Sequence, residues 1–301
     1  MKLRSLFDRK KCVFSFEIFP PKADAAPDSV TAILPGLARL APDYVSITYG
    51  AGGSGSRNLT ADLAKQVKAH GVEPLAHLTC MGNDAQSVRR ILDDLAAGGI
   101  ENVLALRGDR RPDLRESPDF AHASDLAAFL RRDGRFNIAG ACYPEGHFES
   151  ESLDADLRNL KKKIDAGVTH LNTQLFFDNE DFYAFRERAQ KAGIDVPIQA
   201  GIMPVVRPAQ IRRIVSLAGV KIPNKLSRLF ARFGEDERAM RDAGIAYATD
   251  QIADLIAAGA DGVHLYIMNN LSVAETLTAN VSRLLESRNA EPCKTEENRR
   301  V

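Results

Sequence analysis

The chain has 301 residues, of which 40 are basic and 40 acidic, and 45% of its residues are hydrophobic. This length suits two ordinary domains or one large α/β barrel, and the balanced charge gives no indication of a nucleic-acid partner. The apolar runs are too short for a membrane span, and Met1–Lys11 lacks the apolar centre of a secretion signal. We therefore expect a cytoplasmic protein that binds neither nucleic acid nor membrane.

Short apolar, β-branched runs recur along the chain, and an amphipathic stretch follows each of them. The predicted strands are Val13–Phe19, Tyr44–Tyr49, Glu73–Thr79, Asn102–Arg107, Asn137–Tyr143, His170–Phe177, Pro197–Met203 and Gly262–Met268. The predicted helices are Asp28–Leu40, Leu59–Ala69, Ala85–Ala97, Ser124–Arg132, Ser152–Ala166, Glu180–Ala192, Ala209–Leu217 and Leu271–Leu285. Because the strands are apolar on both faces, as in parallel sheets, eight such units favour a (β/α)8 TIM barrel. An open, doubly wound sheet is the alternative.

The interval between the seventh and eighth strands holds two additional helical segments, at Asn224–Phe233 and Asp236–Ala258. We expect this insertion to lie on the loop side of the barrel, where it would help to cover the site. No change of composition divides the chain, so residues 1–286 are expected to form a single catalytic barrel. The polar residues 287–301 are expected to be a disordered tail.

Glu17 is the residue that most strongly indicates chemistry, because it lies inside a strand that is otherwise apolar. Burial of an unpartnered carboxylate is costly, so such a group usually has a function. Here it would be an acid that still holds its proton near neutral pH. The structural alternative is a glutamate paired with a Lys or Arg of a neighbouring strand. Alternation places Glu17 on the face of Val13 and Ser15, which we expect to line the barrel interior.

Polar residues gather at the carboxyl ends of the predicted strands, where barrel enzymes hold their active sites. Strand ends are polar in general because loops follow, but Glu17, His77, Arg107 and Gln174 lie within or against apolar runs. The full set is Glu17, Thr48, His77, Thr79, Arg107, Asp109, Tyr143, Glu145, His147, Gln174, Asp178, Tyr266 and Asn269.

The sequence offers no metal-binding pattern. Four cysteines, Cys12, Cys80, Cys142 and Cys293, show no CxxC spacing, and three of them belong to predicted strands or strand ends. They are interpreted as core thiols rather than as metal ligands or disulfides. His77 and His147 lack the spacing of metal ligands and are interpreted as hydrogen-bonding residues.

Gly50–Gly55 matches the G-x-G-x-x-G pattern of dinucleotide-binding turns. That interpretation also needs a helix that opens within the motif and an acidic residue at the end of the next strand. We expect the helix to open only near Asn58, and the acid of the next strand, Glu73, lies at its beginning. A glycine loop that lets a flat ligand approach the backbone is the preferred interpretation.

The helix after the fifth strand carries Asp156, Asn159, Lys162 and Lys163, of which the first three lie along one side. Such residues usually form a solvated face. Beside a barrel mouth, the same face could hold a diphosphate and its ribose.

Together, these segments resemble the methylenetetrahydrofolate reductase family. The resemblance runs in order from about residue 12 to residue 285 and covers only the family's catalytic barrel. It is carried by Phe16–Lys22, Thr48–Gly53, His77–Cys80, Leu106–Asp109, Tyr143–Glu145, Thr173–Asp178 and Gly201–Pro204.

The resemblance implies a barrel that binds FAD and passes hydride from NADH or NADPH to methylenetetrahydrofolate in two separate half-reactions. It places Glu17 at the general-acid position and Asp109 near the flavin and pterin rings, as a catalytic and flavin-binding residue. It implies that Glu17, Gln174 and Gln210 contact the reduced folate or the nicotinamide nucleotide. The flavin-binding positions that it implies are Thr48, His77, Arg107, Gly108, Asp109, Ala141, Tyr143, His147, Asp156, Asn159, Lys162 and Lys163. We also expect a homo-oligomer.

The chain departs from the family pattern at two places. Ile214 stands where some bacterial members have a Phe that stacks on the substrate, and Asn269–Asn270 stands where Asn-Arg is common. The first change bears on the nicotinamide donor and the second on the folate tail. Two alternatives remain open: another FAD barrel, similar to proline dehydrogenase, and a folate- or flavin-binding subunit that needs a partner for electrons.

Overall fold

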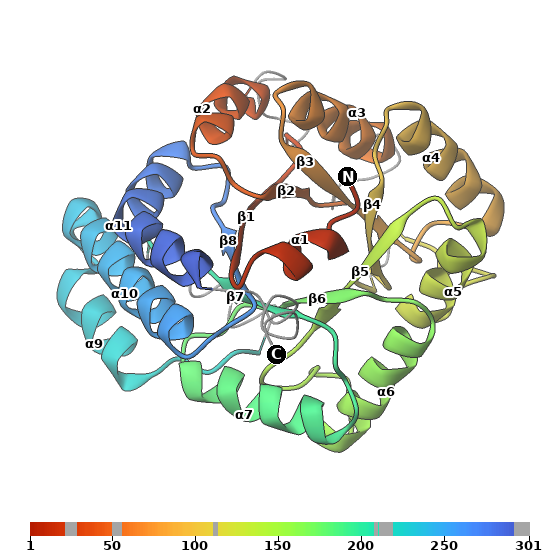
Figure 1. The fold of residues 1–301 in the computed structure, drawn as a ribbon. Coiled ribbons are helices and arrows are strands. Elements are labelled where there is room, and N and C mark those ends of the chain that lie inside the picture. Colours follow the sequence, from red (N-terminus) through yellow and green to blue (C-terminus); the bar gives the residue numbers. More distant parts are fainter. Residues whose placement is uncertain (22–28, 50–55, 111–113, 208–209, 211–218, 292–301) are drawn as a thin grey trace, which may run out of the picture.

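The computed structural model describes residues 1–21, 29–49, 56–110, 114–207, 210 and 219–291. Eight parallel strands form a closed barrel in chain order, with β1 paired to both β2 and β8, which confirms the predicted (β/α)8 fold (Figure 1). The strands are β1 (Val13–Ile18), β2 (Tyr44–Ile47), β3 (Glu73–Thr79), β4 (Asn102–Leu106), β5 (Asn137–Cys142), β6 (His170–Thr173), β7 (Ile198–Ile202) and β8 (Gly262–Tyr266).

Helices surround the barrel in an outer ring (Figure 1). They are η2 (Thr31–Ile33), α2 (Leu34–Arg39), α3 (Ser56–Ala69), α4 (Ala85–Ala97), α5 (Ala123–Asp133), α6 (Leu153–Asp165), α7 (Asn179–Lys191), α10 (Glu237–Ala257) and α11 (Leu271–Ala290). Helix α3 begins three residues before the predicted helix, directly after the glycine run. The closed barrel, and the position of Glu73 at the start of β3, exclude the dinucleotide-binding sheet that this run could have indicated.

One helix was not predicted, α1 (Arg4–Arg9), which crosses the centre of the barrel in Figure 1. Its Leu6, together with Leu3, packs on the interior side chains of the strands and closes the end of the barrel opposite the site. That interior cluster comprises Leu3, Leu6, Val13, Tyr44, Leu75, Leu104 and Ala139.

The alternation of side chains along β1 is as predicted. Phe14, Phe16 and Ile18 belong to the large apolar layer between strands and helices, whereas Val13 belongs to the interior cluster. Full burial of each of these side chains contributes about 1.5–3 kcal/mol to folding. Since Glu17 shares the face of Val13, the same packing directs its carboxyl into the barrel.

Several strands end earlier than predicted, and β6 shows the reason. The prediction continued to Phe177, but the strand ends at Thr173, after which the chain leaves the ladder. Leu175 and Phe177 then pack against Met203, Val205 and other residues after β7. Arg107 and Tyr143, likewise, lie just beyond β4 and β5. The residues past the ladders are those that form the rim of the site.

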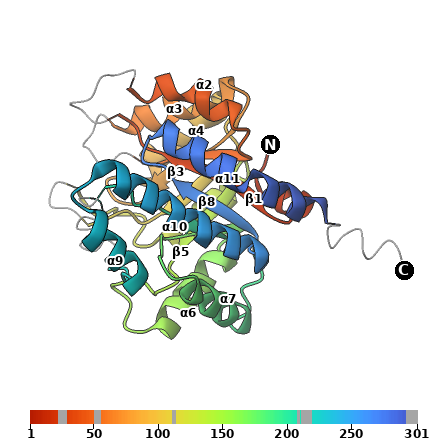
Figure 2. The same cartoon turned by 90° about the vertical axis from the view of Figure 1, so that its left-hand side faces the viewer.

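The insertion between β7 and β8 is only partly as expected. Helix α10 packs against α7, α11, β7 and β8 and is therefore a member of the outer ring, not an added cover. Its Gly244 passes so close to the loop after β7 that an added Cβ would lie 1.9 Å from the Val205 carbonyl oxygen. Helix α9 (Asn224–Phe233) packs outside α10, on the opposite side of the molecule from the N-terminus in Figure 2. Apart from Gln210, the predicted helix Ala209–Leu217 lies outside the described residues.

The last helix, α11, continues to Ala290, so the first residues of the predicted tail are helical. Asn289 explains the extension, because its side chain accepts a hydrogen bond from the Cys12 N–H and donates one to the Cys12 carbonyl. Residues 292–301 lie outside the described part of the chain.

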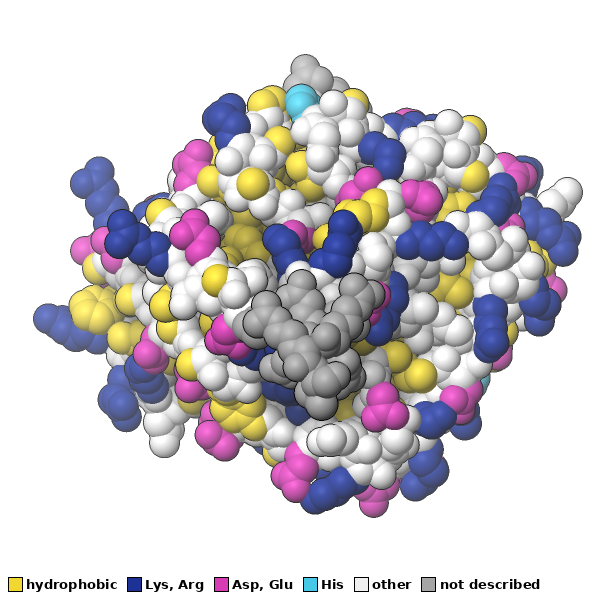
Figure 3. Space-filling model, viewed as in Figure 1, with side chains coloured by type: hydrophobic (Ala, Val, Ile, Leu, Met, Phe, Trp, Pro, Cys, Tyr) yellow, Lys and Arg dark blue, Asp and Glu magenta, His cyan; other side chains and the backbone are white. Residues whose placement is uncertain are grey.

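The surface in Figure 3 carries lysines and arginines interspersed with aspartates and glutamates. No broad region of a single charge is visible on this face. Within the described residues, no helix combines the length and the apolar character that crossing a membrane requires.

Candidate active site

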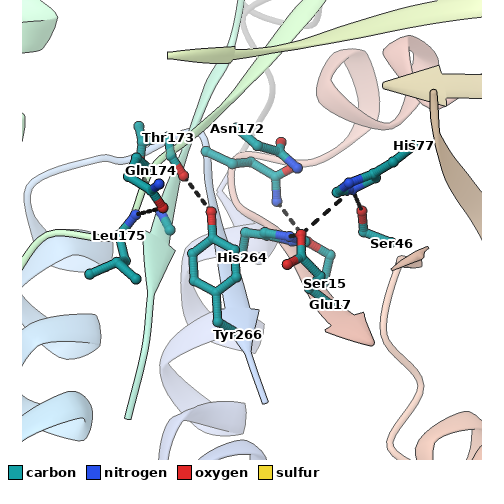
Figure 4. A network of polar contacts seen from close by, with 12 residues as sticks. Ser15, Glu17, Ser46, His77, Asn172, Thr173, Gln174, Leu175, His264 and Tyr266 are labelled. Atoms are coloured by element: carbon teal, nitrogen blue, oxygen red, sulfur yellow. Dashed lines mark hydrogen bonds and ion pairs between the residues drawn. The ribbon is translucent and has the colours of Figure 1, made fainter. Parts of the chain in front are cut away.

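Glu17 lies near the carboxyl end of β1 and is 7% exposed. Its Oε2 lies 3.5 Å from Nε2 of His77 and 3.4 Å from Nε2 of His264 (Figure 4). Among the described residues, no Lys or Arg lies within ion-pair distance of this carboxyl. The alternative interpretation, a glutamate paired with a Lys or Arg of a neighbouring strand, is therefore wrong for the described part of the chain. The structure therefore holds a carboxyl in a largely dry setting, with imidazoles as its polar neighbours.

His77 comes from the interior face of β3 and is held by a hydrogen bond to Ser46. Its Nε2 lies 2.6 Å from the Ser46 hydroxyl, which projects from β2. Burial lowers the pKa of His77 to about 4, against a smaller opposing effect of Glu17. His77 is thus neutral at pH 7 and adds no cation beside the carboxyl.

His264 was missed as a candidate. It is 1% exposed on the interior face of β8, where its Nδ1 lies 2.7 Å from the Ser15 hydroxyl (Figure 4). The strand pairing places Ser15 directly beside His264 and Glu17 beside Tyr266. The alternation of side chains along β8 could have indicated it. His264 lies two residues before Tyr266, a predicted site residue, and therefore occupies the same face of the strand.

Arg107, Gly108 and Asp109 follow β4 and form one side of the rim. The guanidinium of Arg107 makes two hydrogen bonds to the carboxylate of Glu149, which raise the pKa of Arg107. Gly108 has a φ of 84°, and a Cβ there would lie 3.1 Å from Thr79 and 3.2 Å from Met81. The positive φ and these two close neighbours favour glycine at this position. Asp109 is exposed.

The loop after β5 supplies aromatic side chains to the same rim. Tyr143 and His147 meet edge to face, with ring centroids 4.6 Å apart, and Phe148 stacks on His147. Burial raises the pKa of Tyr143 to about 12 and lowers that of His147. Both groups are neutral at pH 7 and can donate or accept hydrogen bonds without a charge.

The predicted ligand-binding residues of helix α6 form two groups, one that faces the rim and one that is exposed farther out. Lys163 reaches inward and donates a 2.6 Å hydrogen bond to the carbonyl of Ala141, and burial lowers its pKa. Asp156 accepts a hydrogen bond from the Ser150 hydroxyl. Asn159 and Lys162 are exposed and bond to each other at 3.0 Å. Lys163 and Asp156 therefore face the rim, and the other pair lies farther out.

Three further predicted residues, Thr48, Gln174 and Gln210, come after strands β2, β6 and β7. Thr48 follows β2, and its N–H bonds to the Ile18 carbonyl at the end of β1. Gln174 follows β6 and accepts a hydrogen bond from the Leu175 N–H. Gln210 accepts hydrogen bonds from two N–H groups of its own turn, so its carbonyl oxygen stabilises that turn.

The departure at Asn269–Asn270 has a structural explanation. Asn269 pairs with the backbone of Phe19, accepting from its N–H at 2.8 Å and donating to its carbonyl at 2.9 Å. Asn270 caps α11 by accepting from the Val273 N–H. Both asparagines thus stabilise loops beside Glu17. Ile214 and the glycine run Gly50–Gly55 lie outside the described residues.

The fold and the site define a (β/α)8 barrel enzyme with a buried acid at the centre of its mouth. No group of at least three His, Cys, Asp or Glu suited to a metal ion is found in the described residues.

Comparison with known proteins agrees with a (β/α)8 barrel enzyme and identifies the family to which the chain belongs. A family model described as methylenetetrahydrofolate reductase matches residues 2–282. The 5,10-methylenetetrahydrofolate reductases of Pectobacterium carotovorum and of Escherichia coli K12 are each 37% identical over 261 residues, 86% of this chain and 87% of theirs. The chain belongs to the methylenetetrahydrofolate reductase family, and is thus an oxidoreductase of folate one-carbon metabolism.

Two more distant comparisons concern the length and the fold. An Arabidopsis thaliana protein named methylenetetrahydrofolate reductase (NADH) 1 is 32% identical across 95% of this chain, which spans only 51% of that relative. A solved structure from Clostridium thermocellum, described as binding two copies of 5-methyl-5,6,7,8-tetrahydrofolic acid, superposes with a TM-score of 0.66 at 13% identity. It covers 95% of this chain and 99% of its own, and this similarity bears on the fold alone.

Proposed function

We propose that this protein reduces methylenetetrahydrofolate to methyltetrahydrofolate with hydride from NADH or NADPH, transferred through a bound FAD, and that Glu17 is the general acid. The observation that carries the proposal is the setting of Glu17. The carboxyl is 7% exposed at the mouth of the barrel, and its polar neighbours among the described residues are imidazoles. A group held in this way can give up a proton in the site without competition from a fixed cation.

The substrate explains why an acid is needed. The bridged folate ring has to open to a cationic iminium before it can accept hydride, and protonation of the leaving nitrogen makes that opening possible. Glu17 supplies this proton from the interior face of β1. After the transfer, an N–H of His264, 3.4 Å away, can stabilise the carboxylate that remains.

The rim residues fit FAD. Arg107, Lys163 and His147 offer donors for a diphosphate, and a flat ring could lie along the partly exposed backbone of Gly108. The residues that would hold FAD are Thr48, His77, Arg107, Gly108, Asp109, Ala141, Tyr143, His147, Asp156, Asn159, Lys162 and Lys163. When bound, the flavin supplies a hydride acceptor and donor.

The charged and amide residues at the mouth orient the substrates. Asp109 is exposed beside Gly108, where its negative charge favours the cationic iminium. Gln174 lies past the end of β6 and can offer its amide N–H2 to folate or nicotinamide, because its oxygen already accepts the Leu175 N–H. Gln210 contacts the substrate through its N–H2, since its oxygen stabilises the turn.

An anaerobic test separates this proposal from the alternatives. The purified protein, loaded with FAD, is mixed with NADH and then with NADPH, and the flavin absorbance is followed. We expect prompt bleaching, followed by reoxidation when methylenetetrahydrofolate is added; the "(NADH)" in the name of the Arabidopsis relative favours NADH. A protein that cannot be loaded with FAD would exclude the flavin mechanism. Bleaching without reoxidation by the folate would favour another FAD barrel, and no bleaching by either nucleotide would favour a subunit that needs a partner.

A further inference from the structure

A continuous chain of buried polar side chains lies beneath Glu17 inside the barrel. Barrel interiors at this level are usually filled by branched apolar side chains. Here the described residues include five polar ones that are each at most 4% exposed, namely Ser15, Tyr44, Asn172, Gln199 and His264. Buried polar groups that are satisfied by one another fix a single arrangement of donors and acceptors.

The orientation of the Gln199 amide is set by its surroundings. Its Nε2 lies 3.3 Å from the Val13 carbonyl oxygen, 3.5 Å from that of Val263 and 3.2 Å from the Ser15 hydroxyl. Its Oε1 accepts a 2.6 Å hydrogen bond from the Tyr44 hydroxyl. The opposite orientation would place an oxygen against two carbonyl oxygens, so Nε2 is the atom that faces Ser15.

This orientation favours one placement of the protons on Ser15 and His264. Since Gln199 donates to the Ser15 hydroxyl, the hydroxyl hydrogen is free to point at Nδ1 of His264, 2.7 Å away. A neutral imidazole that accepts at Nδ1 carries its proton on Nε2. Nε2 of His264 lies 3.4 Å from Oε2 of Glu17, and the imidazole points toward the carboxyl in Figure 4. We propose that Gln199 is a positioning residue that, through Ser15, holds His264 in the tautomer whose N–H faces Glu17.

One competing arrangement exists. The Tyr44 hydroxyl also interacts with Ser15, and its ring stacks on His264 with centroids 5.9 Å apart. If Ser15 donated to Tyr44 instead, His264 would donate from Nδ1 and present a lone pair to Glu17. The Tyr44 oxygen, however, already accepts a 3.0 Å hydrogen bond from Asn172. A bond from Ser15 would have to be a second one to that oxygen, whereas Nδ1 of His264 lies only 2.7 Å from the Ser15 hydroxyl, so we favour donation by Ser15 to His264.

The consequence for chemistry rests on the proposed role of Glu17. An N–H that faces Glu17 stabilises the carboxylate left when the proton moves to the folate. The other tautomer would accept the proton of Glu17 at its Nε2 lone pair and divert it from the substrate. Gln199 therefore acts through Ser15 on the tautomer of His264, and this tautomer decides whether the proton of Glu17 is available to the folate.

The tautomer can be read directly from the ¹⁵N resonances of labelled histidine in the full-length protein at pH 8, assigned with a His264→Asn variant. We expect the wild type to be protonated on Nε2 of His264, and Gln199→Met to lose that preference. Tyr44→Phe should keep it, because Gln199 still donates to Ser15. The competing arrangement predicts the Nδ1–H form in the wild type and a change to the Nε2–H form in Tyr44→Phe. Protonation on Nδ1 in the wild type, or an unchanged tautomer in Gln199→Met, would overturn the proposal.

Gln251→Met is the matched control, because Gln251 is also a buried glutamine but bonds to the Phe176 carbonyl, outside this chain of side chains. It should leave the tautomer and both half-reactions unchanged. Gln199→Met should slow flavin reoxidation by the folate roughly five- to tenfold, the effect of one net hydrogen bond, and leave flavin reduction by NADH unchanged. A changed tautomer with an unchanged folate rate would overturn the link to Glu17. The ¹⁵N result does not depend on whether Glu17 is the acid, so the two proposals can fail separately.

Discussion

The interior around Glu17 and the rim around Arg107 are built in opposite ways. In the interior, each described polar group is nearly inaccessible to water, and imidazoles and hydroxyls surround one carboxyl. At the rim, full charges are partly exposed and paired with each other, as in Arg107 with Glu149. Burial makes the protonation of a single group controllable, whereas exposed charges can exchange partners when a charged ligand arrives. The comparison separates a region that handles a proton from a region that holds a ligand.

The largest expected effect of a single change belongs to the interior. Glu17→Gln should slow flavin reoxidation by methylenetetrahydrofolate about 10²- to 10⁴-fold, the range for loss of a general acid, and leave flavin reduction by NADH nearly intact. Anaerobic stopped-flow absorbance measures the two half-reactions separately. Equal loss in both would mean that Glu17 is structural and would remove the distinction between the two regions.

A change at the rim should instead alter affinity. Lys163→Met removes a cation that reaches inward from α6 and should weaken FAD binding roughly 10- to 100-fold, the effect of a charge-assisted hydrogen bond. Titration of flavin fluorescence measures this, and the folate rate of the fully loaded variant should be retained. Lys161→Met is the control, because Lys161 lies on the same helix but pairs with Asp165. An equal loss of affinity in both variants would contradict a specific role for Lys163.

The burial of His77 in the interior should also make the stability of the protein depend on pH. Burial lowers the pKa of His77 to about 4 from an ordinary value of 6.5, so between these values the unfolded chain binds more protons than the folded one. Its contribution to stability is therefore complete above about pH 6.5 and is lost as the pH falls toward 4. Between pH 7.5 and 5, this amounts to about 2 kcal/mol.

Urea unfolding of His77→Asn at the two pH values should show a smaller loss on acidification than the wild type by about this amount. Part of the loss should remain, because burial also lowers the pKa of His170 to about 3. The exposed His70 provides the control, and His70→Asn should keep the wild-type difference. An undiminished difference in His77→Asn would show that the interior is wetter than its packing indicates.

The smallest expected effect concerns the negative charge at the rim. Asp109→Asn should slow the folate half-reaction roughly fivefold and the nicotinamide half-reaction less, because an exposed charge is screened by water. Stopped-flow rates at low and high salt measure it, and the difference from wild type should shrink with salt. No change in either half-reaction would exclude an electrostatic role for Asp109.

The barrel and Glu17 could be predicted from the sequence, because both depend on local patterns. Eight buried parallel strands repeat a strong apolar signal, and a carboxylate within one of them is conspicuous. The six-residue helix α1 gave too short a pattern to be recognised. The expected oligomeric state stays a prediction.

Most of the interior network could not be predicted in this way. His264, Gln199 and Tyr44 are single polar residues in apolar strands, and only the closed barrel brings β1, β2, β7 and β8 together around Ser15. Alternation shows which face such a residue occupies, but not which donor it will meet across the barrel. For the rim, the positions at strand ends could be predicted from the sequence, and the roles came from the family resemblance.

The central claim is that Glu17 delivers a proton to the bound folate, and a crystal structure of the protein with FAD and methylenetetrahydrofolate tests it most directly. The account predicts the Glu17 carboxyl within about 2.6–3.2 Å of the leaving nitrogen, or one water away, and no Lys or Arg paired with it. A carboxyl that faces bulk solvent, or that is held by a cation far from the folate, would contradict it.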